Sequence, residues 1–465
     1  MNSKLEEFYR SIAGRNVTVI GIGVSNAPLI KLLVQKGALV TACDRRTAQE
    51  LGPVAQELSQ LGVTLRLGDH YLDGISGDLI FKTPGMRFDN PALERARAQG
   101  CRVTSEMEVF FELCPCRLIA VTGSDGKSTT TTLVAKLLEA QGYTVHLGGN
   151  LGRPLLPDIE SISPQDVAVL ELSSFQLHTM RKSPDIAVIT NLSPNHLDWH
   201  TSMEEYIDAK KNIFLHQSQQ DLLVLNADNE ITASMASQAK GRVRTFGKRK
   251  ENFLYTDGQH NILHDGEILL RRSEVLLPGD HNIENYMAAI CAVWDLVSRE
   301  SIRRVAGSFA GLEHRLELVR TRNGVRYYND SIASSPTRTM ACLNSFDQKL
   351  ILLLGGYDKH IPFDELGEAL CDKASAVILT GHTADAIERA IRGAKKFVPG
   401  FPEIFHAANM EEAVGRAADI AREGDVVVLS PACASFDLYQ NFMERGQVFK
   451  ACVAALKEDT NERKG

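Results

Sequence analysis

A glycine-rich loop that contains a lysine is the clearest chemical feature of the sequence. The segment TGSDGKST (residues 122–129) follows an apolar run and precedes a helical pattern. Glycines let backbone N–H groups close around a phosphate, while Lys127 adds positive charge and Ser128 can hold Mg²⁺. A common phosphate loop has glycine six positions before its lysine, where this chain has Val121. We therefore predict a shortened phosphate loop rather than a chance glycine turn. Its candidate contacts are Gly123, Ser124, Asp125, Gly126, Lys127, Ser128 and Thr129.

Two further polar side chains follow apolar runs that predict strands. Glu171 lies near the end of DVAVLELS (166–173), and His196 lies beyond DIAVITN (185–191), close to Asp198. The loops of parallel strands gather at one edge of a sheet, where a carboxylate and an imidazole can hold a metal ion. An exposed loop acid and a structural histidine are the alternatives, and the residues alone leave them open.

Lys210 lies in SMEEYIDAKKNIF (202–214), where Ser202 and Glu205 have the spacing of a capping box. That spacing predicts the start of a helix. From the residues alone, Lys210 and Lys211 are interpreted as a surface pair.

A second glycine turn lies near the N-terminus. Gly21 and Gly23 follow a predicted strand, and Asp44 comes twenty-one residues after Gly23. This resembles a dinucleotide fingerprint, but Asn26 stands in place of its third glycine. A nicotinamide cofactor and another nucleotide remain equally open here.

The elements that position these residues alternate between strand and helix. This βαβ order predicts parallel sheets with the functional loops at the carboxyl ends of the strands. The pattern restarts twice, so we predict an α/β chain of three consecutive domains: a Rossmann-like N-terminal domain, a P-loop ATPase-like central domain and a Rossmann-like C-terminal domain. The expected boundaries are 1–107, 108–312 and 313–465.

Composition agrees with three domains. The chain has 465 residues, of which 44% are hydrophobic and 23% charged, as in ordinary globular proteins. Acidic residues outnumber basic ones 58 to 51, which argues against a nucleic-acid binder. No apolar run is long enough to span a membrane and no signal-peptide core follows the N-terminus, so a cytoplasmic protein is expected.

Nine cysteines are scattered along the chain without paired C-x-x-C motifs. This spacing disfavours zinc and predicts free, mostly buried thiols. Cys114 and Cys116 are close, and a chance pair beside Pro115 is the preferred interpretation.

The combined motifs resemble the Mur ligase family over nearly the whole chain. The similar segments are TGSDGKST, ELSSFQL (171–177), NLSPNHLDWH (191–200), YIDAKKNIF (206–214), GDHNIENYMAA (279–289), GLEHRLE (311–317), NDS (329–331) and LSPACASFD (429–437). Within the family, ELSSFQL, GLEHR and SPACASFD favour the branch that adds D-glutamate. The resemblance implies ATP-dependent addition of D-glutamate to UDP-N-acetylmuramoyl-L-alanine through an acyl phosphate, in peptidoglycan precursor synthesis.

The resemblance also implies roles for the catalytic residues. Lys127 and Ser128 hold the ATP phosphates and one Mg²⁺ together with Glu171, and Glu171 and His196 face a second Mg²⁺. Lys210 matches a lysine that the family carbamylates, which reverses its interpretation as a surface residue. A carbamate would convert this cation into an oxygen ligand of the second metal, and its formation requires a neutral amine.

Contacts to the rest of ATP and to the UDP-sugar are carried over in the same way. Asn282 and Asn285 resemble adenine-side contacts, Arg315 an arginine that reaches the ATP phosphates, and Asp330 the acid that holds the ribose. Arg315 and Asp330 lie at the start of the third domain, so closure of that domain is expected to complete the ATP site. The residues that resemble UDP-sugar contacts are Val24, Ser25, Asp44, Arg45, Thr83 and Asn150.

The amino-acid pocket shows one departure from the family. Some members have lysine where this chain has Ile332, and Ser334 takes the place of a threonine. One cationic contact to D-glutamate is therefore missing, and nearby serines can hydrogen-bond the carboxylate instead. The residues that resemble the pocket are Lys359, Ser334, Ser435, Phe436 and Phe442.

Three rival functions follow from the same sequence. A Mur ligase that adds another amino acid is the nearest. A nicotinamide oxidoreductase leaves the phosphate loop, Glu171 and His196 unexplained, and a non-catalytic nucleotide-binding regulator leaves Lys210 and Lys359 unexplained. Nothing indicates an obligate protein partner, so a monomer is expected.

Overall fold

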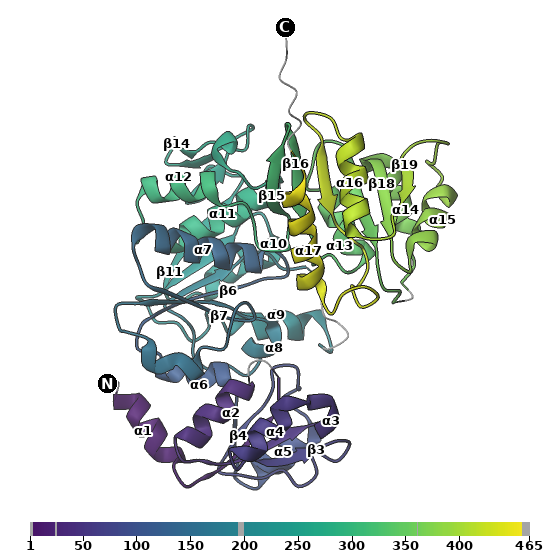
Figure 1. Ribbon diagram of the computed structural model, residues 1–465. Coiled ribbons are helices and arrows are strands. Elements are labelled where there is room, and N and C mark those ends of the chain that lie inside the picture. The colour runs from purple at the N-terminus through teal and green to yellow at the C-terminus, as the bar shows by residue number, and fades with distance from the viewer. Residues whose placement is uncertain (1–2, 24–25, 194–199, 360, 458–465) are drawn as a thin grey trace. The chain divides into compact units, whose positions relative to one another are not determined.

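The chain folds around three β-sheets (Figure 1). The computed structural model describes residues 3–23, 26–193, 200–359 and 361–457. Residues up to Glu274 together with Ile283–Val305 form one compact unit, and Val275–Asn282 with the residues from Ala306 onward form the other. The first unit contains two of the sheets and the second unit contains the third. The predicted α/β class and the predominance of parallel strands are confirmed.

The first sheet is parallel, in the order β3-β2-β1-β4-β5. This order places β1 in the middle, with the glycine turn at its carboxyl end, as in Rossmann folds. The strands are β1 (Asn16–Ile20), β2 (Leu39–Asp44), β3 (Thr64–Leu67), β4 (Leu79–Phe81) and β5 (Arg102–Thr104). The helices are α1 (Ser3–Ile12), α2 (Asn26–Gln35), α3 (Ala48–Leu51), α4 (Pro53–Gln60) and α5 (Pro91–Ala98).

The second sheet has the order β14-β13-β12-β11-β10-β9-β6-β8-β7, parallel from β7 to β12. Its strands are β6 (Arg117–Thr122), β7 (Val145–Gly149), β8 (Val167–Glu171), β9 (Ile186–Ile189), β10 (Leu222–Asn226), β11 (Arg242–Gly247), β12 (Leu254–Thr256), β13 (Ile262–His264) and β14 (Glu267–Leu270). Its helices are α6 (Glu106–Leu113), α7 (Lys127–Gln141), η1 (Leu156–Ser161), α8 (Ser174–Leu177), α9 (Met203–Lys211), α10 (Glu230–Ser234), η2 (Met235–Gln238), η3 (Arg272–Glu274), α11 (Asp280–Val293) and α12 (Arg299–Ser308). The antiparallel strands β13 and β14 were not predicted.

The third sheet has the order β15-β16-β20-β17-β18-β19, with β15 as an antiparallel edge. Its strands are β15 (Glu317–Arg322), β16 (Val325–Asn329), β17 (Leu350–Gly355), β18 (Ala374–Thr380), β19 (Glu403–His406) and β20 (Val426–Leu429). Its helices are α13 (Pro336–Leu343), α14 (Asp364–Lys373), α15 (Ala384–Gly393), α16 (Met410–Ile420) and α17 (Phe442–Ala455).

Helix α7 is bounded by two glycines. Gly126 at its N-cap and Gly142 at its C-cap both adopt left-handed backbone conformations, with φ of 76° and 103°. Such conformations favour glycine because it lacks a Cβ atom. Leu133, Leu137 and their apolar neighbours are fully buried. The helix therefore starts at Lys127, directly after the phosphate loop.

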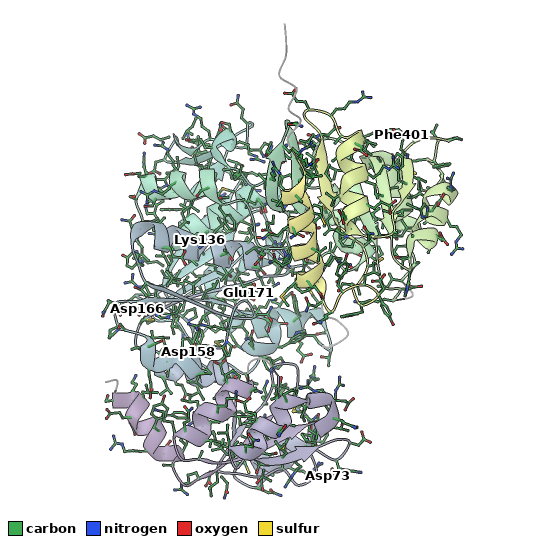
Figure 2. All side chains as sticks on the ribbon, viewed as in Figure 1. Asp73, Lys136, Asp158, Asp166, Glu171 and Phe401 are labelled. Atoms are coloured by element: carbon green, nitrogen blue, oxygen red, sulfur yellow. The ribbon has the colours of Figure 1, made fainter. Side chains whose placement is uncertain are left out.

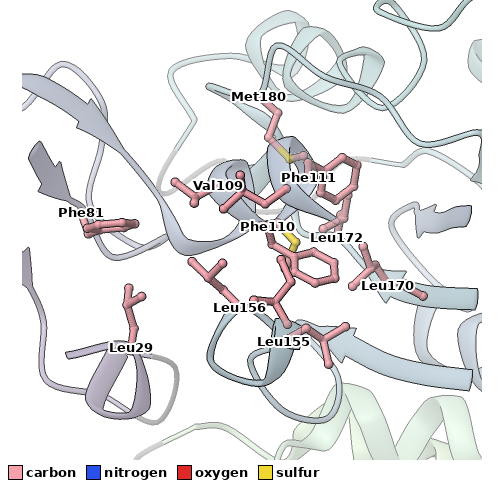
Figure 3. Close-up of a cluster of buried hydrophobic side chains, with 14 of the residues drawn as sticks. Leu29, Phe81, Val109, Phe110, Phe111, Leu155, Leu156, Leu170, Leu172 and Met180 are labelled. Atoms are coloured by element: carbon pink, nitrogen blue, oxygen red, sulfur yellow. The ribbon is translucent and has the colours of Figure 1, made fainter. Parts of the chain in front are cut away.

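Helix α6 anchors the start of the second sheet through buried aromatic side chains (Figure 3). Phe110 and Phe111 are fully buried in a cluster that also contains Leu155, Leu156 and Leu170. Truncating a buried phenylalanine of this kind costs about 3–5 kcal/mol. The packing holds α6 and η1 together beside β6 and β8, and so supports the strands that carry the candidate site.

Glu106, at the start of α6, makes stability depend on pH. Its side chain is buried and accepts a hydrogen bond from Leu156 N at 2.9 Å. Burial raises the pKa of this carboxyl from 4.5 to about 7, despite hydrogen bonds from the Leu155 and Leu156 backbone. The folded state therefore holds a proton that the unfolded state releases. The contribution of protonated Glu106 to stability is fully present below pH 4.5. It is lost as pH rises through about 7, and the loss is roughly 3 kcal/mol at most.

Glu106→Gln is accordingly expected to reduce the loss of thermal stability between pH 5 and pH 8. The exposed Glu112, on the same helix, pairs with Arg102 at 2.9 Å and supplies the control Glu112→Gln. Melting temperatures of the three proteins at both pH values provide the measurement. Identical pH dependence in wild type and Glu106→Gln would contradict this role for Glu106.

The state of the cysteines and the apolarity of the helices can be stated for the described part of the chain. All nine cysteines are free thiols, and six of them are buried. In the described ranges, no helix combines the length and apolarity needed to cross a membrane.

Candidate active site

The phosphate loop closes on itself between β6 and α7. Lys127 Nζ donates to Gly123 O at 3.1 Å and to Ser124 O at 2.8 Å. Both acceptors belong to the loop that the lysine follows, so its ammonium group lies over the loop backbone. This is the arrangement expected of a lysine that meets phosphate oxygens at a helix N-terminus.

The residues that follow β9, the strand beside β6, hold the phosphate loop through hydrogen bonds. Thr190 Oγ1 donates to Asp125 O at 2.6 Å, and Asp125 N donates to Asn191 Oδ1 at 2.9 Å. A Cβ atom on Gly123 would lie only 1.9 Å from Thr190 Oγ1, which explains why this position is glycine. Sequence reasoning missed Thr190 and Asn191, although both fall at the end of a predicted strand.

Glu171 lies at the end of β8 and is 2% exposed (Figure 2). One carboxylate oxygen, Oε1, accepts from Asn150 Nδ2 at 2.8 Å. The other, Oε2, is buried and has no hydrogen-bond partner in the described part of the structure. A buried carboxylate oxygen is costly unless something compensates it, and a divalent cation does so well. The residue therefore fits the predicted role of metal ligand.

Asn150 was predicted as a UDP-sugar contact, and the structure gives it a further task. Its backbone N donates to Glu171 O at 2.7 Å, in addition to the side-chain bond. The preceding Gly149 has a positive φ, and a Cβ atom there would lie 2.2 Å from Glu171 O. The GGN turn thus fixes the orientation of the Glu171 carboxylate.

Lys210 is buried within the site rather than at the surface. It is 2% exposed, and Nζ donates to Thr122 Oγ1 at 3.1 Å and to Gly123 O at 2.8 Å. Burial, reinforced by the charge of Lys127, lowers the pKa of Lys210 well below its ordinary value. The interpretation as a surface lysine from the residues alone was wrong, because α9 directs this side chain to the end of β6.

The start of α9 differs from the predicted capping box. Ser202 accepts from Glu205 N at 3.2 Å as expected, but the Glu205 carboxylate accepts from the backbone and hydroxyl of Thr201. The same carboxylate also receives Arg87 Nη2 at 3.0 Å and contacts His178 Nε2 at 3.1 Å. It is therefore the anchor of the helix that carries Lys210.

Glu205→Gln is expected to destabilise the protein by about 2 kcal/mol, the scale of losing hydrogen bonds to a charged group. Glu204→Gln provides the matched control, because Glu204 is the exposed neighbour on the same helix. Thermal melts at pH 7 should show a clear decrease for Glu205→Gln and almost none for Glu204→Gln. Equal melting temperatures for the two variants would remove Glu205 as an anchor.

Asn285, on α11, reaches the phosphate-loop side of α7. Thr130 Oγ1 donates to Asn285 Oδ1 at 3.2 Å, and a Cβ atom on Gly126 would lie 2.2 Å from the same oxygen. Asn282, one helical turn earlier, is also buried and donates to Pro278 O at 2.6 Å. The structure thus brings Asn285 to the loop, as its predicted ATP contact requires.

The glycine turn at the end of β1 surrounds the carboxylate of Asp44. Asp44 accepts from Ile22 N at 2.7 Å and from the Arg46 guanidinium at 2.9–3.0 Å. Burial opposes ionisation of this carboxyl, but these hydrogen bonds outweigh it and lower its pKa to about 2. Arg45, the predicted contact, is exposed, whereas sequence reasoning missed Arg46. Thr83 lies opposite the turn, 3.1 Å from where a Gly21 Cβ atom would be.

Three predicted site residues lie outside the described residues: Val24, Ser25 and His196. Their predicted roles therefore remain predictions.

The predicted ribose acid, Asp330, is buried at the end of β16. Its carboxylate accepts from Ser430 Oγ at 2.9 Å and from Leu316 N at 3.3 Å. Burial raises its pKa to about 7, although Ser430, the Leu316 backbone and the charge of Arg315 oppose the rise. Arg315 and Asp330 therefore lie near each other within the second unit.

Four of the predicted amino-acid residues lie on loops after β16, β17 and β20, and the fifth, Phe442, is the first residue of α17. Buried Arg445 connects these loops by donating to Ser331 O at 2.9 Å and to Ala434 O at 3.1 Å, and Tyr357 N donates to the same Ala434 O at 2.9 Å. Ser331 Oγ in turn donates to Phe442 O at 2.7 Å. Sequence reasoning missed Arg445, because an arginine on a C-terminal helix gives no signal of burial.

The side chains predicted to contact the amino acid differ in their exposure to solvent. Ser435 is buried, Ser334 and Phe442 are half-buried, and Lys359 and Phe436 are exposed. Ile332, which replaces the family lysine, is half-buried on the same loop as Ser334. The second unit therefore gathers a hydroxyl, aromatic rings and one cation on neighbouring loops.

Comparison with known proteins agrees with this arrangement. Three family models match in order: the MurD-like N-terminal domain of Mur ligases over 15–105, the Mur ligase middle domain over 121–293 and the Mur ligase glutamate ligase domain over 314–433. Curated relatives match almost end to end. One from Acetivibrio thermocellus is 50% identical over 98% of this chain and 100% of its own. The chain belongs to the Mur ligase family.

Two curated relatives of this Mur ligase share a name. The protein from Acetivibrio thermocellus is called UDP-N-acetylmuramoylalanine–D-glutamate ligase. So is a protein from Clostridium perfringens, which is 49% identical over 97% of this chain and 99% of its own.

Solved structures agree with the fold of this Mur ligase. The UDP-N-acetylmuramate-alanine ligase MurC from Thermotoga maritima is 21% identical, with a TM-score of 0.58 over 95% of this chain and 100% of that one. A UDP-N-acetylmuramoyl-L-alanyl-D-glutamate–2,6-diaminopimelate ligase is 18% identical, with a TM-score of 0.58 over 96% and 94%.

Proposed function

We propose that this Mur ligase adds D-glutamate to UDP-N-acetylmuramoyl-L-alanine at the expense of ATP, as a step in peptidoglycan precursor synthesis. The observation that carries the proposal is the identity of about half of the residues, over almost the whole chain, with proteins named for that reaction. ATP phosphorylates the substrate carboxylate, the amine of D-glutamate attacks the acyl phosphate, and phosphate leaves. ADP and the new amide are the products.

The first step depends on charge and position rather than on a protein nucleophile. Lys127 is placed to neutralise the ATP phosphates as negative charge moves toward the leaving ADP. Backbone N–H groups of the loop orient the same phosphates, and Asn285 holds α11 against α7 beside them. Thr190 and Asn191 keep the loop in one shape, so little reorganisation is needed when the phosphoryl group is transferred.

The metal site is proposed from the donors that the chain offers. Ser128 and Glu171 would hold one Mg²⁺, and Glu171, His196 and a carbamylated Lys210 a second. Support comes from the uncompensated Oε2 of Glu171, because a hard cation prefers such an oxygen. When bound, Mg²⁺ would neutralise charge on the transferring phosphoryl group.

Carbamylation of Lys210 requires a neutral amine that attacks CO₂, with release of one proton. Burial of Lys210 favours that form, since the charged ammonium is costly in a low-dielectric site. The resulting carbamate would supply two oxygens as metal ligands, and its remaining N–H would still be able to donate to Thr122 Oγ1 or Gly123 O, which now accept from Nζ.

The three domains would divide the substrates among them. We propose that residues 1–107 hold the UDP-sugar, 108–312 hold ATP and metal ions, and 313–465 hold the amino acid. Asp44, Arg46 and Thr83 mark the first site. Ser435, Phe442 and Lys359 mark the last, with the Ser334 hydroxyl as a substitute for the missing lysine at Ile332. A monomer in the cytoplasm remains the prediction from the sequence.

Phosphate release tests the proposal. The protein is mixed with ATP, Mg²⁺, UDP-N-acetylmuramoyl-L-alanine and D-glutamate, and each component is omitted in turn. Release is expected only from the complete mixture. Replacing D-glutamate with L-lysine or diaminopimelate tests the nearest rival within the family. Release that ignores either substrate, or that is faster with another amino acid, would overturn the proposal.

A further inference from the structure

The nine thiols include one pair whose sulfurs touch. Cys114 Sγ and Cys116 Sγ are 3.5 Å apart, within hydrogen-bond distance for sulfur. All nine cysteines lie in the described part of the chain, and no other two have sulfurs in hydrogen-bond contact there. The contact shows that the Cys-Pro-Cys segment brings its two thiols together in a specific local arrangement.

The backbone fixes this arrangement. Cys114 is the C-cap of α6, where its N donates to Phe110 O at 2.8 Å. Cys116 immediately precedes β6, and Pro115 between them restricts the backbone to a narrow range. Since α6 and β6 are both anchored in the core, the two thiols have little freedom to separate.

The two thiols differ in the way that an attacking and a resolving cysteine differ. Cys114 is half-buried and accessible, whereas Cys116 is only 8% exposed. The hydrogen bond from Cys116 lowers the pKa of Cys114, and the charge of nearby Lys182 adds to the effect. That bond and burial raise the pKa of Cys116. The thiolate, which is the reactive form, is thus favoured at Cys114, the more exposed of the two residues.

We propose that Cys114 and Cys116 form a reversible thiol–disulfide modification site, oxidised by hydroperoxides and reduced by small thiols. The Cys114 thiolate attacks a peroxide oxygen, which breaks the O–O bond, gives a sulfenic acid and, with one proton, releases water from hydrogen peroxide or an alcohol from an organic hydroperoxide. The Cys116 thiol then attacks that sulfur, forming the S–S bond and releasing water. Two electrons pass from the two sulfurs to the peroxide in all.

The disulfide would be readily reversed. The sulfurs must approach from 3.5 Å to about 2.05 Å, in a ring that spans only one intervening residue. Small strained disulfides have high reduction potentials and are the labile ones. The bond would join the end of α6 to the start of β6, in the stretch between the first two matched family domains.

The sequence offers a clean test. Trypsin cuts after Arg102 and Arg117, so the peptide 103–117 contains Cys114 and Cys116 and no other cysteine. The full-length protein is treated with equimolar hydrogen peroxide, alkylated, digested and weighed. We expect this peptide to lose two hydrogens and to resist alkylation, and dithiothreitol to reverse both changes. Cys101 and Cys452, the other partly exposed cysteines, serve as internal controls in separate peptides.

Single variants separate the two roles. In Cys116→Ser, a sulfenic acid at Cys114 should persist long enough to be trapped by dimedone. In Cys114→Ser, oxidation of Cys116 should be at least about tenfold slower than that of Cys114 in wild type, because it lacks accessibility and thiolate character. Melting temperatures verify that both variants fold. Oxidation of Cys101 or Cys452 as fast as Cys114, or a peptide 103–117 that remains fully alkylated, would overturn the proposal.

Discussion

Lys210→Ala is expected to lower kcat by about 10²- to 10³-fold, the range found when one preorganised group that stabilises developing charge is removed. The wild-type side chain is almost completely buried and bonded to Thr122 and Gly123, so it belongs to the site and not to the surface. If the carbamate supplies a metal ligand, excess formate or acetate should restore part of the activity, and bicarbonate should not. Phosphate release under saturating substrates is the measurement.

Two further variants make this result interpretable. Lys211→Ala removes the adjacent lysine, which is less buried and pairs with Asp208 at 3.0 Å, and its activity should stay within about twofold of wild type. Lys210→Arg keeps the positive charge, but a guanidinium does not lose its proton and cannot form the carbamate. Wild-type turnover by Lys210→Arg would refute the carbamate, whereas equal losses in Lys210→Ala and Lys211→Ala would show general damage to α9.

Gly126→Ala is expected to damage the phosphate loop far more than a similar change at the other end of α7. Both capping glycines have positive φ, which costs an alanine about 1 kcal/mol. At Gly126 the new Cβ would also lie 2.2 Å from Asn285 Oδ1, so either the Asn285 side chain leaves its hydrogen bond with Thr130 or the loop shifts. We expect ATP affinity to fall at least about tenfold, which corresponds to 1.4 kcal/mol.

Gly142→Ala is the matched control, because nothing lies within 4 Å of its new Cβ. It should lower the melting temperature slightly and leave ATP affinity unchanged. Calorimetric titration with a non-hydrolysable ATP analogue measures the affinities, and thermal melts measure the stabilities. The explanation by steric contact fails if both variants bind the analogue equally well.

Local patterns sufficed for the elements that carry the site. The apolar runs before Thr122 and Glu171 predict β6 and β8, and the glycine-rich loop predicts the start of α7. The role of Lys127 followed from its loop alone. Burial of Lys210 did not, because its own helix resembles a surface helix, and only the family resemblance indicated a functional role.

What could not be predicted depends on contacts distant in sequence. Thr190 and Asn191 hold the phosphate loop because β9 lies beside β6, a pairing that no local pattern encodes. The bond between Arg46 and Asp44 was not predicted, because side-chain direction after a strand end changes with each residue. Strands β13 and β14 were missed since three or four residues with little alternation give almost no signal.

The hydrogen bonds of Arg445 affect how the loops of the amino-acid pocket respond to pH. Its guanidinium is bonded to backbone carbonyls and a serine hydroxyl, and burial lowers its pKa only to about 10. None of these groups changes charge between about pH 5 and pH 9. The hydrogen bonds of Arg445 are therefore insensitive to pH over that interval. A change in amino-acid affinity there arises from other groups, such as the ligand or Asp330 on the loop after β16, whose pKa burial raises to about 7.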